Sequence, residues 1–271
     1  MRVRIIFGLK NRGAKIHFHH QHLLTKFSSQ IISKCEPKYR DFKYYNFSGI
    51  KGQIKVGKGG LHYLSSKVTL VFSSLNIEFI NQFLNALFTL KEVQIGEMEL
   101  SPESIEMEAE VDFEQKTKFV CISPILILDP ILHVEENKSF FEPDTDDFSD
   151  FVYESTMLRM EKSGMYTAEQ ISSYNQFQLT PDKEYLSRMA QDDKKYSRVY
   201  QTYINGEKYE VRGYTFPFTL FASPEVQNFI FHSGLGALCE NGFGMIDLAN
   251  VDPTSRTIKY SLEQSGTSVQ A

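Results

Sequence analysis

Residues 234–247 read GLGALCENGFGMID, a pattern in which two Gly-X-Gly units are separated by five residues. A predicted helix, residues 224–231, precedes this stretch, and a last predicted strand, residues 243–248, follows or overlaps its end. Glycines permit positive φ and close approach of the backbone, so their N–H groups can point at phosphate oxygens. A dinucleotide fingerprint needs a preceding strand, and a P-loop needs lysine where Met245 stands, so neither motif fits. The residues alone leave two interpretations open: a phosphate-binding loop, or a tight helix-to-strand connection packed on a sheet.

The first 115 residues alternate strand-like and helix-like patterns. Residues Arg2–Leu9 alternate along the chain, which predicts a strand. Apolar residues recur every three or four positions over residues 19–34 and 76–90, and this spacing predicts two amphipathic helices. The other predicted strands are residues 42–47, 67–72, 93–100 and 105–111. The order is β-α-β-β-α-β, which is that of a ferredoxin-like domain.

A similar order of elements recurs in the second half of the chain. The predicted elements are a strand over 118–128, a helix over 148–160, strands over 196–204 and 209–221 around the turn Asn205-Gly206, and the helix and strand that flank the glycines. Ser223 is expected to cap that last helix, with Pro224 at its first position. The sequence therefore predicts an α+β protein with two tandem ferredoxin-like (RRM-like) βαββαβ domains. The predicted units are residues 1–115, residues 116–261 and a tail over 262–271.

Charge is distributed very unevenly along the 271 residues, although the formal net charge is only −5. Residues 1–70 carry +12, residues 71–165 carry −14 and residues 166–271 carry −3. Such an asymmetry favours a polyanion-binding face confined to the first part of the molecule. The alternative is a basic surface that only balances the acidic middle of the chain.

Several features favour a cytoplasmic protein. The apolar runs are much shorter than a bilayer span, so no membrane association is expected. The first ten residues contain no long apolar stretch of the kind found in secretory signals. Cys35, Cys121 and Cys239 lie far apart and form neither a zinc pattern nor an even disulfide set, so we expect reduced, buried thiols.

The glycine stretch, read as G-L-G-x(5)-G-F-G-M-I-D, resembles the C-terminal signature of the RAMP superfamily. Within it, the chain is most similar to the CRISPR repeat-processing endoribonucleases. The strand Arg2–Leu9, followed by a helix that opens with HHQHLL at residues 19–24, resembles the start of that family.

This resemblance implies that the protein binds CRISPR repeat RNA and cuts precursor crRNA within the repeat, without a metal or other cofactor. The ribose 2′-OH would attack the adjacent phosphate and leave 2′,3′-cyclic phosphate and 5′-OH ends. The alternative is a catalytically inactive repeat-RNA-binding subunit of an effector complex. The resemblance leaves open whether the protein forms a homodimer or joins other CRISPR-associated proteins.

Such a cleavage needs a base, an acid and positive charge near the phosphate, and histidine suits either proton role. His22 and Lys26 share the polar stripe of the first predicted helix, one turn apart, and are the first catalytic candidates. His20 lies nearer the apolar side of that helix, where packing or capping is expected, and is a further candidate. Related proteins commonly carry a catalytic histidine in or just after this helix. Residues 39–52 contain none, so Tyr44 and Lys51 are second candidates.

The predicted RNA-binding residues are basic side chains of the first domain and the glycines of the signature. The basic side chains are expected to contact phosphates and to contribute to the salt dependence of binding. The full set is Arg2, Arg4, Lys51, Lys55, Lys58, Gly234, Gly236, Gly242 and Gly244.

Overall fold

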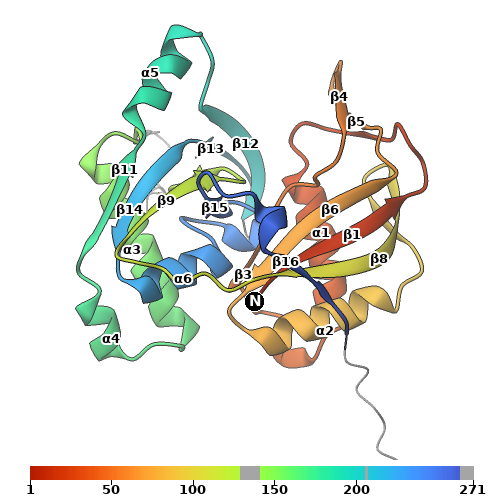
Figure 1. The fold of residues 1–271 in the computed structure, drawn as a ribbon, viewed down its shortest axis with the longest axis horizontal. Coiled ribbons are helices and arrows are strands. Elements are labelled where there is room, and N and C mark those ends of the chain that lie inside the picture. The colour runs from red at the N-terminus through yellow and green to blue at the C-terminus, as the bar shows by residue number, and fades with distance from the viewer. Residues whose placement is uncertain (129–140, 205–206, 263–271) are drawn as a thin grey trace, which may run out of the picture.

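The computed structural model describes residues 1–128, 141–204 and 207–262, and it consists of two halves that lie side by side (Figure 1). Each half is built on an antiparallel sheet with two helices on one face. The predicted turn at residues 205–206 and most of the predicted tail, residues 263–271, lie outside the described residues. Within the described residues, no helix is both long and apolar enough to cross a membrane.

The first half has the predicted ferredoxin-like order of elements. These are β1 (Arg2–Leu9), α1 (Gln21–Ile32), β3 (Tyr45–Phe47), β6 (Lys67–Ser74), α2 (Ile77–Phe88) and β8 (Met98–Glu108). The sheet runs β8-β1-β6-β3, and every neighbouring pair is antiparallel. The predicted α+β fold with ferredoxin-like halves is therefore confirmed.

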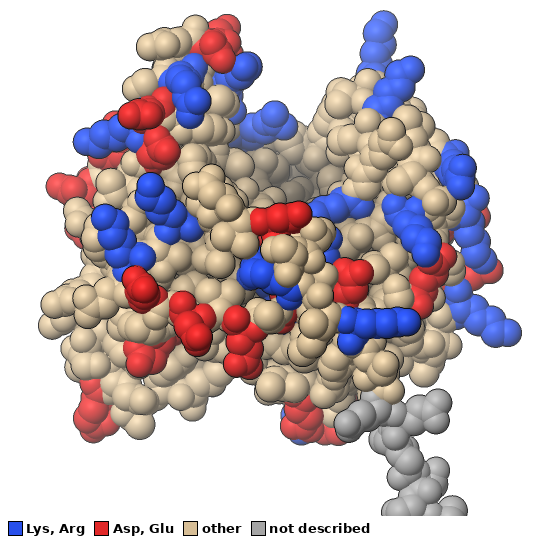
Figure 2. All heavy atoms as spheres, viewed as in Figure 1, with Lys and Arg blue, Asp and Glu red and all other residues tan. Residues whose placement is uncertain are grey.

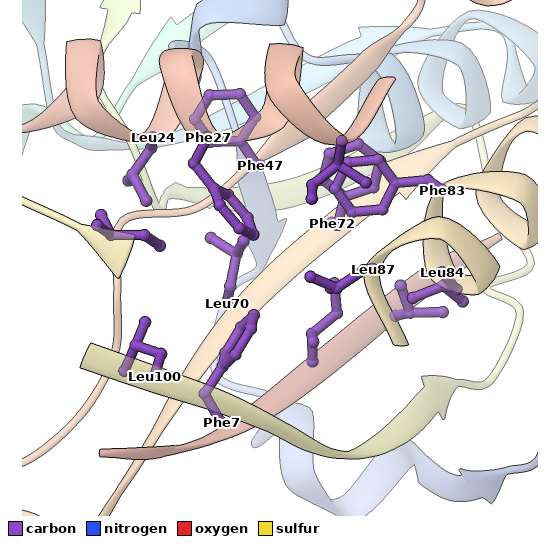
Figure 3. Close-up of a cluster of buried hydrophobic side chains, with 14 of the residues drawn as sticks. Phe7, Leu24, Phe27, Phe47, Leu70, Phe72, Phe83, Leu84, Leu87 and Leu100 are labelled. Atoms are coloured by element: carbon purple, nitrogen blue, oxygen red, sulfur yellow. The ribbon is translucent and has the colours of Figure 1, made fainter. Parts of the chain in front are cut away.

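The apolar periodicity of the two helices builds the core of this half. Phe27 of α1 and Leu87 of α2 point towards sheet residues such as Phe7, and all three are almost fully buried (Figure 3). Phe72 of β6 stacks on Phe83 of α2, with ring centroids 4.0 Å apart. Full burial of each such side chain contributes about 1.5–3 kcal/mol, so this face of the sheet is fixed against its helices.

The second half repeats the same topology. Its elements are β9 (Lys116–Cys121), α3 (Asp146–Ser163), β11 (Phe177–Pro181), β14 (Pro217–Ala222), α6 (Pro224–Ser233) and β15 (Ile246–Leu248). The sheet order β11-β14-β9-β15 is that of the first half read from the other edge. Ser223 caps α6 as predicted, because its Oγ accepts a hydrogen bond from the Val226 N–H at 3.4 Å.

The structure corrects the predicted middle strands of this half. Residues 196–204 and 209–221 were expected to supply the second and third strands, but β12 (Ser197–Ile204) pairs with β13 (Glu207–Tyr214) along its whole length. That hairpin joins β10 (Ile125–Leu126) in a separate sheet. The missing second strand is β11, which is only five residues long, and such a short run gives too few alternations to be recognised.

Further insertions and returns complete the fold. Between β3 and β6 the chain forms a ribbon of β4 (Ile54–Gly57) and β5 (Gly60–Tyr63), which pairs with β2 (Lys15–Ile16). The remaining elements are η1 (Pro37–Tyr39), β7 (Val93–Ile95), α4 (Ala168–Ser173), α5 (Lys183–Gln191), η2 (Cys239–Asn241), η3 (Pro253–Arg256) and β16 (Thr257–Tyr260). The predicted unit 116–261 includes β16, yet β16 pairs with β8 and extends the sheet of the first half.

Candidate functional site

The glycine segment, residues 234–244, is packed at the junction between the two halves. Asn46 of β3 donates a hydrogen bond from its side-chain nitrogen to the Phe243 carbonyl at 2.7 Å. Gly242 has a φ of 82°, and a Cβ atom there would lie 2.3 Å from the ring of Phe47. A Cβ atom at Gly234, where φ is 87°, would lie 1.9 Å from the Asn46 side chain. Only glycine fits these positions, because the segment approaches β3 so closely.

The backbone amides of this segment are used inside the protein. The N–H groups of Gly234, Gly242 and Gly244 donate to the carbonyls of Ile230, Cys239 and Pro124, respectively, at 2.7–2.9 Å. Gly236 is buried, and a Cβ atom there would lie 2.4 Å from the Leu126 carbonyl. Three of the four amides are thus hydrogen-bonded within the protein, which argues against the predicted contact of these glycines with RNA phosphates. The geometry favours the alternative interpretation, a tight helix-to-strand connection.

Arg159 of α3 supports the same segment from the second half. Its guanidinium donates hydrogen bonds to the carbonyls of Gly234, at 2.7 Å, and Gly236, at 3.4 Å, and also to that of Ser233. A cation at a helix C-terminus stabilises the carbonyls that the helix leaves unpaired. Sequence reasoning missed this residue, since nothing in the pattern of α3 marks one arginine as turned inward.

Helix α1 brings the first catalytic candidates close to the glycine segment. The Thr25 hydroxyl donates to the Asn241 carbonyl at 3.3 Å, so this side of the helix faces η2. His22 and Lys26 are both exposed and lie one turn apart, next to that side. The structure thus gives His22 and Lys26 the shared, accessible helix face that their spacing predicts.

His20, just before α1, is buried and held in one orientation. Its side chain is among the buried polar groups, with an exposed fraction of 7%. Nδ1 donates to the His17 carbonyl at 2.9 Å, and Nε2 has no hydrogen-bond partner among the described residues. Burial lowers the pKa of His20, and the nearby His22 and His19 add to this effect. His20 therefore packs against the body of the protein, as its place beside the apolar stripe predicts.

Of the second catalytic candidates, Lys51 lies apart from this helix face. Lys51 pairs with Thr69, whose sequence neighbours Val68 and Leu70 are buried in the core, so Lys51 lies on the sheet face opposite the helices. Burial lowers the pKa of Lys51, and nearby arginines lower it further. Tyr44 is half-buried at the junction, where burial raises its pKa, making it a still poorer base. The structure therefore does not bring Lys51 to the exposed helix face.

Arg2 holds the two halves together. Its side chain is only 2% exposed and pairs with Glu108 at 3.1 Å and with Asp247 at 3.5 Å. It also donates to the Ile246 carbonyl at 2.8 Å and lies over the ring of Phe231, 4.5 Å from its centroid. The prediction that Arg2 contacts RNA is therefore corrected, because its guanidinium is enclosed by partners from both halves.

The other basic candidates differ in their exposure. Arg4 is mostly enclosed, with 12% of its side chain exposed, and pairs with Glu106 at 3.4 Å. Lys55 and Lys58 are exposed on the β4–β5 ribbon. Figure 2 shows Lys and Arg side chains gathered at the end of this ribbon. These two lysines are accessible to a polyanion, as the charge of the first 70 residues predicts.

A cleft between the halves adds residues that the sequence analysis did not single out. The His19 ring meets Tyr200 of β12 edge-on, with centroids 5.1 Å apart, and Tyr200 meets Phe243 of the glycine segment in the same way at 5.5 Å.

Among the residues that the structure describes, no group of three or more His, Cys, Asp or Glu side chains is arranged to hold a metal ion.

Comparisons with solved structures give the same architecture. A CRISPR associated protein Cas6 has a TM-score of 0.72 at 19% identity, over 92% of this chain and 99% of its own. A Cas6-related protein from Pyrococcus furiosus has a TM-score of 0.75 at 19% identity, over 93% and 99%. A RAMP protein that binds different RNA substrates has a TM-score of 0.74 at 20% identity, over 92% and 99%. At these identities the likeness establishes the fold.

Sequence comparison supplies the family. A search of curated proteins finds no match. The family described as CRISPR associated protein Cas6, C-terminal, matches residues 106–248, which is more than half of the chain. Its match covers the second ferredoxin-like half, including the glycine segment. The chain therefore belongs to the Cas6 family of CRISPR-associated proteins.

Proposed function

We propose that this protein binds CRISPR repeat RNA and cleaves it by metal-independent attack of a ribose 2′-OH on the adjacent phosphate. The observation that carries the proposal is the accessible His22–Lys26 pair beside the glycine segment, in a chain that belongs to the Cas6 family. A fold relative that binds different RNA substrates supports RNA as the ligand.

The chemistry assigns one task to each side chain of the pair. The 2′-oxygen forms a bond to phosphorus and loses its proton to a base, while the bond from phosphorus to the 5′-oxygen breaks and that oxygen takes up a proton. His22 transfers one of these protons, and the Lys26 ammonium stabilises the negative charge that develops on the phosphorane. The products are a 2′,3′-cyclic phosphate and a 5′-OH.

Binding is assigned to basic side chains outside this pair. Lys55 and Lys58 are exposed on the ribbon and suit phosphate contacts that carry no sequence information. Arg4 and Lys51 lie on the open face of the first sheet, where they are partly accessible. The RNA is therefore expected to lie along the first half.

The test is incubation of the protein with repeat RNA in EDTA, followed by analysis of the RNA ends. One cut with a cyclic phosphate is expected. Replacing the 2′-OH immediately 5′ of the cut with hydrogen should abolish cleavage and leave binding unchanged. Cleavage of this deoxy substrate would show that the proposed nucleophile is wrong.

A second candidate function is repeat-RNA binding without cleavage. It is favoured by the absence of histidine from residues 39–52 and by the burial of His20, which removes that ring from the exposed helix face. Lys51, the other cation considered for the chemistry, lies on the opposite sheet face. RNA that is bound and recovered intact in the same assay would favour this candidate.

A further inference from the structure

The ribbon of β4 and β5 carries a cationic face that the proposed function uses only in part. Strands β2, β5 and β4 lie side by side in that order, and their register places Lys15 opposite His62 and His62 opposite Lys55. Residues directly opposite each other on antiparallel strands point to the same face. The three side chains therefore form one row across the ribbon, which projects from the first half in Figure 1.

Two glycines leave this face open beside the row. A Cβ atom at Gly57 would lie 2.8 Å from the His62 ring, and one at Gly60 would lie 3.1 Å from the Cε atom of Lys15. A side chain at either position would therefore compete for the space of the imidazole or of the lysine stem. Because both residues are glycine, the ring and the stem lie close against the backbone, and a ligand can approach them from the open face.

The His62 ring is oriented so that one of its nitrogens is free. Its Nδ1 donates a hydrogen bond to the Gly13 carbonyl at 3.2 Å, which fixes the proton of the neutral ring on that nitrogen. Among the described residues, Nε2 has no hydrogen-bond partner. Histidine is the side chain that gains a charge near neutral pH, and the charged ring would present a second N–H at Nε2, between the two lysines.

No carboxylate neutralises this row. Residues 42–77, which include the whole ribbon, contain neither Asp nor Glu. In the part of the chain that the structure describes, Lys15 and Lys55 form no ion pair, whereas Lys67, just beyond the ribbon, pairs with Glu103 at 2.9 Å. Figure 2 shows the Lys and Arg side chains gathered at this end of the molecule. The unpaired cations favour an anion with several oxygen acceptors.

We propose that Lys15, His62 and Lys55 form a phosphate-binding site for the RNA backbone, in which His62 takes up a proton from solvent as the phosphate binds. The Nε2–H of the charged ring donates to a phosphate oxygen, and the lysines on either side neutralise the phosphate charge. Lys58, in the turn between β4 and β5, is the remaining lysine of the ribbon. The inference rests on the proposed function and adds Lys15, His62 and a dependence on pH to the RNA-binding surface. Inorganic phosphate shares this chemistry, and the experiment distinguishes the two sources.

The experiment measures binding of repeat RNA by fluorescence anisotropy at about pH 5.5 and about pH 8, on either side of the range in which histidine changes charge. A series of KCl concentrations at each pH gives the slope of log affinity against log salt. At the lower pH, His62→Gln should bind a few-fold more weakly than the original protein, with a slope smaller by about 0.7–0.9, the value for one phosphate. At the higher pH the two proteins should bind alike.

Two further variants separate charge from structure. His62→Lys carries its charge at both pH values, so it should bind a few-fold more tightly than the original protein at the higher pH. Lys15→Gln should reduce the salt slope by the same amount at both pH values. Because other histidines also titrate, the matched control is His17→Gln, an exposed histidine outside the row, which should keep the full pH response.

The outcomes separate this site from the proposed function. His62 variants whose pH response equals that of His17→Gln would overturn the site and leave the proposed function intact. Failure of the original protein to bind repeat RNA at either pH would overturn both. Inorganic phosphate should compete no better than chloride at equal ionic strength. Displacement of the RNA by millimolar phosphate would show that the row takes the free anion instead.

Discussion

The two halves of the molecule share one strand order but place their cations in two different environments. Two arginines on ferredoxin elements, Arg2 of β1 and Arg159 of α3, are turned inward onto carboxylates and carbonyls. Basic residues on inserted segments, such as Lys55 of the ribbon and Arg198 of the β12–β13 hairpin, are exposed. Arg2 joins the two halves, Arg159 fixes the glycine segment, and the outward cations are available to a polyanion.

This difference assigns separate tasks to separate parts of the fold. The sheets and the glycine segment fix the junction, because buried ion pairs and close backbone packing tolerate little displacement. The inserted segments can vary in charge without disturbing that junction. Helix α1 packs its apolar side into the core of the first half and carries His22 and Lys26 on its exposed side.

The largest effect is expected from His22→Ala, which removes a proton-transferring group without touching the junction or the inserts. Single-turnover cleavage should slow by about 10²–10⁴-fold, while RNA binding stays unchanged. His17→Ala, an exposed histidine outside the helix, is the matched control. A change of only a few-fold in His22→Ala would transfer the catalytic assignment to Tyr44 and Lys51.

Replacing the buried Arg2 tests whether the inward cations stabilise the fold. Arg2→Gln leaves Glu108 and Asp247 buried without one of their cationic partners, and such changes cost about 3–5 kcal/mol of stability. Urea unfolding should show this loss. Lys58→Gln, which changes an exposed cation of the ribbon, should stay within about 0.5 kcal/mol. Equal midpoints for the two variants would remove the distinction between inward and outward cations.

His232 at the junction predicts a dependence of stability on pH. Its pKa is lowered to about 3, mainly by burial and also by the nearby N-terminal ammonium and Arg2. The folded protein therefore keeps His232 neutral, whereas the unfolded chain takes up a proton below about pH 6.5. Stability is full above that pH and falls as the pH drops from about 6.5 towards 3.

The magnitude can be measured by comparison with His232→Gln, which keeps a donor for the Asn228 carbonyl but does not titrate. Between pH 7.5 and 5, the original protein should lose about 2 kcal/mol more than the variant. Parallel stability curves for the two proteins would show that His232 takes up its proton in the folded state.

The smallest effects are expected at the ribbon. Lys55→Gln and Lys58→Gln should each weaken RNA binding a few-fold and reduce its salt slope by about one phosphate. Lys34→Gln, at the far end of α1, is the control for an exposed lysine of the same half. If a ribbon variant had the same salt slope as Lys34→Gln, that lysine of the ribbon would not contact the RNA.

Much of this architecture could be predicted from local patterns. The helices α1 and α2, the strand β1 and the cap of α6 at Ser223 lie where periodicity and capping residues place them. Each depends on residues within a few positions of one another, so the sequence contains the whole signal. The short strand β11 was not predicted, and neither was the place of the predicted β12–β13 hairpin in a separate sheet, because strand partners are chosen across the fold.

In the candidate site, too, local features could be predicted from the sequence and burial could not. The spacing of His22 and Lys26 predicts their shared exposed face, since a helix turn is a local property. The burial of Arg2 could not be predicted, because periodicity reports which side of an element is polar and not what covers that side. Asp247, which pairs with Arg2, is 245 residues away in the chain.

The sequence by itself determined the two ferredoxin-like halves, the glycines at their junction and the membership of the Cas6 family. Only the tertiary structure decided that Gly234 and Gly242 pack on β3 with their amides bound inside the protein. It also decided that cations of the acidic second half line one cleft with Phe18 and His19. The physical reason is distance along the chain. Secondary structure follows from neighbours in sequence, whereas burial and the local sum of charges follow from neighbours in space.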